Sequence, residues 1–210
     1  MAKVDPKSLL AGLSGKVGDL VFSTGRNGTF VRAAPSGPGS RKNRPSTLQQ
    51  EMRARFALAS QFVTRAGKVI RLGCGDHTGS PHGLAIKNLI KDAIEGTGPN
   101  LSINFSKVMV SQGKLSKPDN PVLQLLSNRR LEFSWSNRIR KKTAEMVLAL
   151  FSPVNNHWEA EVCTLNYRKS LFFNIPLSLG ELLEAYVFMR YSDGSKASDS
   201  IYLGSVVLDK

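Results

Sequence analysis

The spacing of the apolar residues changes near Pro99, and this change restricts the fold more than any other feature of the 210-residue chain. Between Leu48 and Ile94 the apolar side chains recur mostly every three or four residues, which is the period of an amphipathic helix. Beyond Pro99 they recur at every second residue, as in a strand with one face in a core. The pattern therefore predicts an α+β fold with a helical part followed by a β part.

The β part predicts about seven strands, separated by turn residues. We place these strands at residues 101–110, 131–135, 146–150, 158–162, 171–175, 186–188 and 202–206. Seven short strands in roughly 110 residues are typical of an immunoglobulin-like or fibronectin-III-like β-sandwich. Trp135 is expected to anchor the core of this sandwich, and Tyr186 to be its corner tyrosine.

The helical part begins with a capping box, since Ser46 is followed three residues later by Gln49. A first helix then carries apolar residues from Leu48 through Met52 and Phe56 to Ile70 on one face. A helical wheel through this segment gathers three cations on the opposite face: Arg53, Lys68 and Arg71. That face is either a binding patch or the solvated side of an ordinary helix. A second helix from residue 84 ends at Gly96 or Gly98, and the two helices form a two-helix segment.

A β-hairpin is predicted near the N-terminus, with strands at 18–24 and 28–34. Asn27-Gly28 is a strong turn signal, because both residue types accept a positive φ. The apolar residues that flank the turn are Val21, Phe22, Phe30 and Val31. A hairpin alone is marginally stable in water, so we expect this one to dock on a neighbour. The predicted organisation is a Gly-rich basic arm at 1–45, a two-helix segment at 46–98 and a sandwich at 99–210.

The chain is strongly basic, with a net charge of +13. Ten Lys or Arg residues and one acid, Glu51, lie between residues 26 and 71. The candidate polyanion- or partner-binding residues are Arg26, Arg32, Arg41, Lys42, Arg44, Arg53, Lys68 and Arg71. Such a block fits nucleic acid phosphates or an acidic protein surface, and it also serves solubility alone.

Catalytic and metal-binding patterns are weak. Cys74, Asp76, His77 and His82 are ligand-type residues, but the second ligand pair typical of a structural zinc site is lacking, so Cys74, His77 and His82 form only a weak candidate site. The sequence has no Walker loop, nucleophile elbow or dinucleotide-binding motif. We therefore expect no enzyme activity, no cofactor and no small-molecule substrate.

The expected compartment follows from three further observations. Two cysteines favour a reducing compartment. The N-terminal apolar run is too short for a signal peptide, and no window approaches a membrane span. We expect a protein made in the cytoplasm that stays there or joins a virion-like or filament assembly.

Several short motifs are distributed over nearly the whole chain: GLSGKVG at 12–18, NGTFVR at 27–32, RPST at 44–47 and RFALAS at 55–60, together with SDS at 198–200 and YLG at 202–204. On these motifs the chain resembles an uncharacterised bacterial family typical of Bacteroidota. The N-terminal order is also similar to that of short proteins encoded near phage structural genes. The resemblance implies a two-part organisation and a non-enzymatic role.

Two functions remain open from the sequence. The first is a structural or assembly subunit, a homo-oligomer or part of a larger assembly, that docks through the hairpin arm and the basic helix. The alternative is a nucleic-acid-associated protein that binds phosphates through the 26–71 block.

Overall fold

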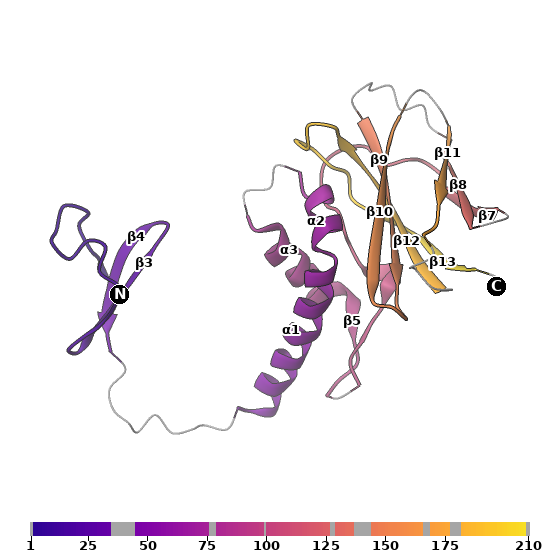
Figure 1. Ribbon diagram of the computed structural model, residues 1–210. Coiled ribbons are helices and arrows are strands. Elements are labelled where there is room, and N and C mark those ends of the chain that lie inside the picture. Colours follow the sequence, from indigo (N-terminus) through magenta and orange to yellow (C-terminus); the bar gives the residue numbers. More distant parts are fainter. Residues whose placement is uncertain are drawn as a thin grey trace. The chain divides into compact units, whose positions relative to one another are not determined.

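The computed structural model describes residues 2–34, 45–75, 79–98, 100–126, 129–136, 144–165, 169–176 and 182–208. The chain divides into two compact units, Met1–Pro45 and Ser46–Lys210 (Figure 1). We call them the N-terminal unit and the main unit. The α+β class is confirmed, because the described residues form several helices and many antiparallel strands. The boundary expected at 98/99 lies inside the main unit, in the connection between two short strands that pair with each other.

The N-terminal unit is a four-stranded antiparallel sheet in the order β1-β4-β3-β2. Its strands are β1 (Ala2–Lys3), β2 (Gly15–Val17), β3 (Leu20–Gly25) and β4 (Gly28–Ala33). The β3–β4 pairing is the expected hairpin, closed by Arg26 and Asn27. Of the Asn27-Gly28 pair, Gly28 adopts a positive φ, of 107°. The two outer strands enlarge the hairpin to a sheet.

The described residues of the helical segment form three α-helices, where the sequence predicts two. They are α1 (Thr47–Arg65), α2 (Gly67–Gly73) and α3 (Pro81–Asn88), and a π-helical turn, η1 (Leu89–Ala93), follows α3. The capping box is confirmed, since the Gln49 N–H donates to Ser46 Oγ and the Ser46 N–H donates to Gln49 Oε1. The first expected helix is interrupted at Ala66, whose ψ of 2° lies outside the helical range.

Residues 101–110 do not form the first strand of the sandwich. Only β6 (Ser102–Ile103) is a strand there, and it pairs with β5 (Ile94–Glu95). A 3₁₀ turn, η2 (Phe105–Lys107), follows. The alternating apolar residues of this segment pack against the helices, so the period-2 pattern reflects burial without a strand.

Two sheets form the β part of the main unit. One has the order β10-β9-β12-β13 and the other β11-β8-β7, with every pairing antiparallel. The strands are β7 (Val122–Leu126), β8 (Arg130–Ser134), β9 (Ala144–Ser152), β10 (His157–Thr164), β11 (Ser170–Asn174), β12 (Leu182–Tyr191) and β13 (Ile201–Val207). A core between the sheets joins Phe133 and Phe173 of the smaller sheet to Leu148 and Leu183 of the larger one. Trp135 belongs to this core, as expected, and stacks on Phe133.

A second core covers the other face of the larger sheet. Phe62 of α1 packs edge-on against Phe151 of β9 and Trp158 of β10, with ring centroids 5.2 and 5.6 Å apart. The helices therefore lie on one side of β9 and β10, and β8 and β11 on the other (Figure 1). This arrangement makes three layers and buries the central strands β9 and β12 on both faces.

Tyr186 has a role different from the expected corner tyrosine. It lies in the middle of β12 on the face turned to the helices, and its hydroxyl donates to the Phe105 carbonyl at 2.8 Å. It joins the sheet to the segment that follows the helices. Among the described residues, no helix is long and apolar enough to cross a membrane.

Candidate functional site

The N-terminal sheet has two faces of different chemistry, and the predicted docking residues are divided between them. Residues paired across antiparallel strands point to the same face, and successive residues to opposite faces. Phe22 pairs with Val31, so these two share one face. Val21 pairs with Arg32 and lies on the opposite face, which Phe30 also shares. The four hairpin residues therefore do not form one surface.

The apolar face is defined by Val17, Leu20, Phe22, Val31 and Ala33, which the strand register aligns. Of these, Phe22 alone is buried, whereas Val17 and Leu20 are 61% and 46% exposed. This face therefore leaves much of its hydrophobic surface in contact with water.

The segment between β1 and β2 adds to the exposed apolar surface. It is fixed to the hairpin by two hydrogen bonds: the Gly12 N–H donates to Thr29 Oγ1 at 2.9 Å, and Thr24 Oγ1 donates to the Leu13 carbonyl at 2.8 Å. Leu9, Leu10 and Leu13 of this segment are nevertheless exposed. They do not close a core over the sheet.

The basic face is defined by Lys3, Lys16, Val21, Phe30 and Arg32. Lys3 pairs with Phe30, while Lys16 and Arg32 both pair with Val21 from opposite sides. The three cations are exposed, and Val21 and Phe30 are half-buried. Sequence reasoning identified Arg32 but missed Lys3 and Lys16, because strands of two and three residues show no period.

The other predicted basic residues are dispersed. Arg26 is exposed in the β3–β4 turn. Arg53, Lys68 and Arg71 are exposed, but the break at Ala66 places Arg53 in α1 and the other two in α2. A single helical wheel therefore does not describe their positions. The remaining candidates, Arg41, Lys42 and Arg44, lie outside the described residues.

The first half of α1 exposes an apolar stripe that the sequence predicts to be buried. Leu48, Met52 and Phe56 lie four residues apart on one side and are 69%, 49% and 55% exposed. The buried residues of this helix, Ala59, Phe62 and Val63, all lie in its second half. The stripe therefore continues the buried side of α1 beyond the core.

Arg55, between the residues of this stripe in sequence, has a structural role. Its guanidinium donates to the carbonyls of Ile94 and Gly96, at 3.2 and 2.6 Å, and forms an ion pair with Glu51 at 3.1 Å. Arg55 thereby fixes the first half of α1 to the β5 turn. Because its guanidinium is already engaged in these contacts, Arg55 is less suited than the exposed cations to bind an external anion.

The weak metal candidate gains no support. Cys74 is buried, burial raises the pKa of its thiol, and His82 is half-buried at the start of α3. His77 and Asp76 lie outside the described residues. Within the described part of the chain, no three His, Cys, Asp or Glu residues are grouped closely enough to hold a metal ion.

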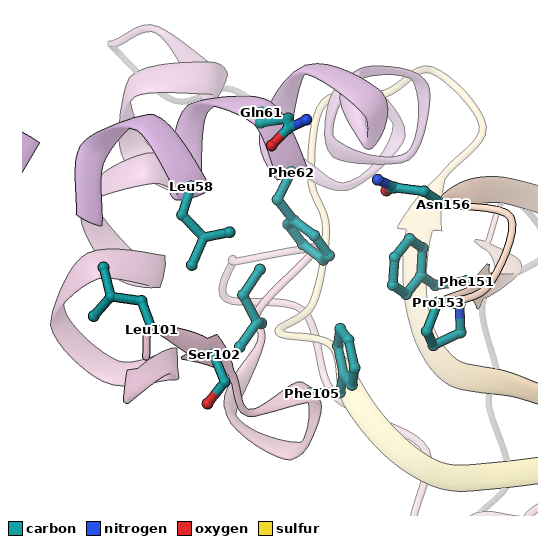
Figure 2. A pocket seen from close by; sticks show the side chains of 10 residues that line it. Leu58, Gln61, Phe62, Leu101, Ser102, Phe105, Phe151, Pro153 and Asn156 are labelled. Carbon is teal, nitrogen blue, oxygen red and sulfur yellow. The ribbon is translucent and has the colours of Figure 1, made fainter. Parts of the chain in front are cut away.

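A cavity of about 240 Å³ lies between α1, β6 and the turn after β9. Figure 2 shows the rings of Phe62, Phe105 and Phe151 around it, with Ser102 and Asn156 among the polar side chains. None of its lining residues is charged. Its volume lies below the roughly 300–1,000 Å³ of typical small-molecule pockets. The cavity is therefore mainly apolar, and its lining contains no pair of residues suited to acid–base catalysis.

A larger cleft of about 480 Å³ lies next to Gly75, between residues 112–116 and 191–197. Lys114 and Lys196 contribute its charged side chains, and both are exposed. Neither cavity combines a nucleophile with a nearby base.

The chain is similar to one family of proteins in sequence and to solved structures in fold. The model of DUF6266, a family of unknown function, matches residues 12–204. The fibronectin-III domain of the human collagen alpha-1(XX) chain has a similar structure with 14% sequence identity, covering 48% of this chain and 90% of that one at a TM-score of 0.35. None of the curated proteins matches significantly. Because the family model spans most of the sequence, the chain belongs to the DUF6266 family.

Proposed function

We propose that this protein is a non-enzymatic structural subunit of a larger assembly, virion-like or filament-like, and that its N-terminal unit attaches to a neighbouring subunit. The observation that carries the proposal is the balance of buried and exposed apolar residues in that unit. Phe22 is its single buried large hydrophobic residue among those described, against five exposed ones. The five are Leu9, Leu10, Leu13, Val17 and Leu20.

A unit of this size needs stabilisation from outside its own core. Below about 70–80 residues a single core rarely contributes more than 3–5 kcal/mol, and such small units usually depend on disulfides, metals or oligomerisation. Residues 1–45 contain no cysteine and no histidine, so a disulfide is excluded and the best zinc ligands are lacking. A neighbouring protein surface that covers the apolar face supplies the missing burial.

The stripe of Leu48, Met52 and Phe56 supports the same proposal from the main unit. Residues at this spacing are those that an amphipathic helix places in a partner's groove. An apolar surface in each unit gives every subunit two attachment points, as a repeating assembly requires.

The test measures the association state of the full-length protein by sedimentation equilibrium over a range of concentrations. We expect oligomers that dissociate on dilution. The variant Val17→Lys/Leu20→Lys should weaken association at least 100-fold, since burial of one such side chain contributes about 1.5–3 kcal/mol. The matched control is Val154→Lys, because Val154 is 75% exposed in the turn between β9 and β10 of the main unit.

Association in Val154→Lys should equal that of the unchanged protein. A protein that stays monomeric at every soluble concentration contradicts the proposal. So does a Val17→Lys/Leu20→Lys variant that associates as strongly as its control.

A further inference from the structure

The basic face of the N-terminal sheet is a second interaction surface, opposite the apolar face. Its cations come from three strands: Lys3 on β1 lies directly across from the half-buried Phe30 of β4, Arg32 follows two residues later on β4, and Lys16 on β2 lies beyond β3. Adjacent strands are about 4.8 Å apart and alternate residues about 6.7 Å apart, so Lys3 and Lys16, on the two outer strands, start about 16 Å from each other, and Arg32 lies between them. A few nucleotides of an extended strand span this patch.

The charge of this face is uncompensated. The residues that the register places on it include Ser23 and glycines besides the three cations and two apolar side chains, and no carboxylate. Among the described residues, none forms an ion pair with Lys3, Lys16 or Arg32. A polyanion therefore meets cations that are not already neutralised.

Phe30 is half-buried, and Lys3 is its cross-strand neighbour on β1. Gly28, two residues earlier on the same face, has no side chain to cover the ring. Lys3 lies in that space, with its Cε 3.2 Å from the position that a Cβ would take at Gly28. A long flexible amine and an aromatic ring thus lie side by side.

We propose that the basic face binds single-stranded nucleic acid, with a base stacked on Phe30 and the flanking phosphates on Lys3, Lys16 and Arg32. An aromatic ring among cations on an open sheet is the arrangement that unpaired bases use, because every base has a π-face and every linkage a phosphate. A duplex hides its bases and gains nothing from the ring. An acidic protein surface uses the cations but not the ring, so Phe30 distinguishes the two ligands.

The experiment measures the binding of the full-length protein to a fluorescein-labelled oligothymidylate of about 12 nucleotides, by fluorescence anisotropy at several salt concentrations. Three phosphate contacts predict a slope of about −2 for the logarithm of the association constant against that of the salt concentration. The variant Lys3→Gln/Lys16→Gln should reduce this slope to about −0.7. Lys87→Gln, an exposed lysine on α3, is the charge control and should leave the slope unchanged.

Phe30→Leu tests stacking while an apolar side chain remains on the sheet. We expect an affinity loss of about tenfold, since stacking on one aromatic residue contributes roughly 1–3 kcal/mol. The matched control is Phe172→Leu: this phenylalanine is 45% exposed on β11, but the Arg130 guanidinium already lies 4.4 Å above its ring. Dispersed amide resonances of residues 2–34 verify that each variant retains the sheet.

Three results overturn the proposal. One is the absence of binding even at low salt. Another is equal slopes for the Lys3→Gln/Lys16→Gln and Lys87→Gln variants. The third is displacement of the oligonucleotide by polyglutamate together with an unchanged affinity in Phe30→Leu, which assigns the face to an acidic protein.

Discussion

Replacing Phe62 by alanine tests whether the helices and the β-sandwich fold as one cooperative unit. Phe62 is 5% exposed and lies where α1 meets the larger sheet. Its ring contacts Phe151 and Trp158 on the sheet and Phe105 on the 3₁₀ turn η2, with centroid separations of 5.2 to 6.4 Å. No smaller residue fills the space between these rings.

The expected loss of stability is large. Truncation of a buried phenylalanine costs about 3–5 kcal/mol, which includes the lost transfer free energy and the cavity left behind. The upper half of this range applies, because rigid rings on both sides limit collapse into the space. With a urea m-value of about 2 kcal/mol/M, the unfolding midpoint should fall by roughly 2 M.

The two tryptophans of the chain report the two cores separately. Trp158 belongs to the core between helices and sheet, and Trp135 to the core between the two sheets. Urea unfolding is followed by fluorescence in Trp135→Phe and Trp158→Phe backgrounds, each with and without Phe62→Ala. One cooperative unit predicts the same shift of the midpoint for both probes.

Phe56→Ala is the matched control, because Phe56 lies on the same helix but is 55% exposed. We expect it to change the free energy of unfolding by less than about 1 kcal/mol. The reasoning is refuted if Phe62→Ala shifts the Trp158 transition and leaves the Trp135 transition in place. That result means that the helices unfold from an independent sandwich.

Three further perturbations have defined outcomes. Gly73→Ala should lower the free energy of unfolding by about 2 kcal/mol, because its Cβ would lie 2.6 Å from Ser111 Cβ; an unchanged thermal midpoint contradicts this. Lys107→Ala should raise the pKa of Glu95 toward its ordinary value in an NMR titration, since the hydrogen bond from Lys107 lowers that pKa most; an unchanged Glu95 pKa opposes the assignment. Burial raises the pKa of Tyr186 above that of the unfolded chain, so its contribution to stability is full below about pH 10 and decreases above it. The urea midpoint should therefore decrease less between pH 9 and 11 in Tyr186→Phe, and equal decreases would refute this.

The central strands show what a period-2 interpretation captures and what it misses. The alternation of Met146, Leu148 and Leu150 correctly predicted a strand facing the inter-sheet core. Val147, Ala149 and Phe151 are equally apolar, and they face the helices. An unbroken apolar run indicates a strand that is covered on both faces. The run at 146–151 therefore indicated that a further layer, the helices, covers the second face of the sheet.

Residues 101–110 and 122–126 show the opposite limit. The first segment alternates, yet its apolar side chains fill the core beneath the helices and only two residues pair as a strand. The second segment, VLQLL, forms the edge strand β7, which is exposed along most of its length. Its apolar and polar residues therefore do not alternate clearly. Burial in a core and pairing in a sheet both produce alternating apolar residues. The two cases can be distinguished only when the elements that pack against the segment are known.

The candidate surfaces depend on pairings that no local pattern specifies. Lys3 and Lys16 join Arg32 through strands of two and three residues whose register follows from the turns between them. Gly12 and Gly18 have positive φ values in the segments before and after β2, and Gly15 has one at the first residue of β2. The sequence shows the glycines, but it does not show which strands pair and therefore does not place Lys3, Lys16 and Arg32 on one face.

The two-sided burial of β9 and β12 has a consequence for how the protein is made. On the ribosome the helices emerge first, whereas the end of β12 follows about 100 residues after Ala93, or roughly 5–20 s at ordinary rates of synthesis. During this interval the ring of Phe62 has no sheet to contact. The nascent chain therefore exposes the apolar side of its helices to solvent until the last strands of the larger sheet are synthesised.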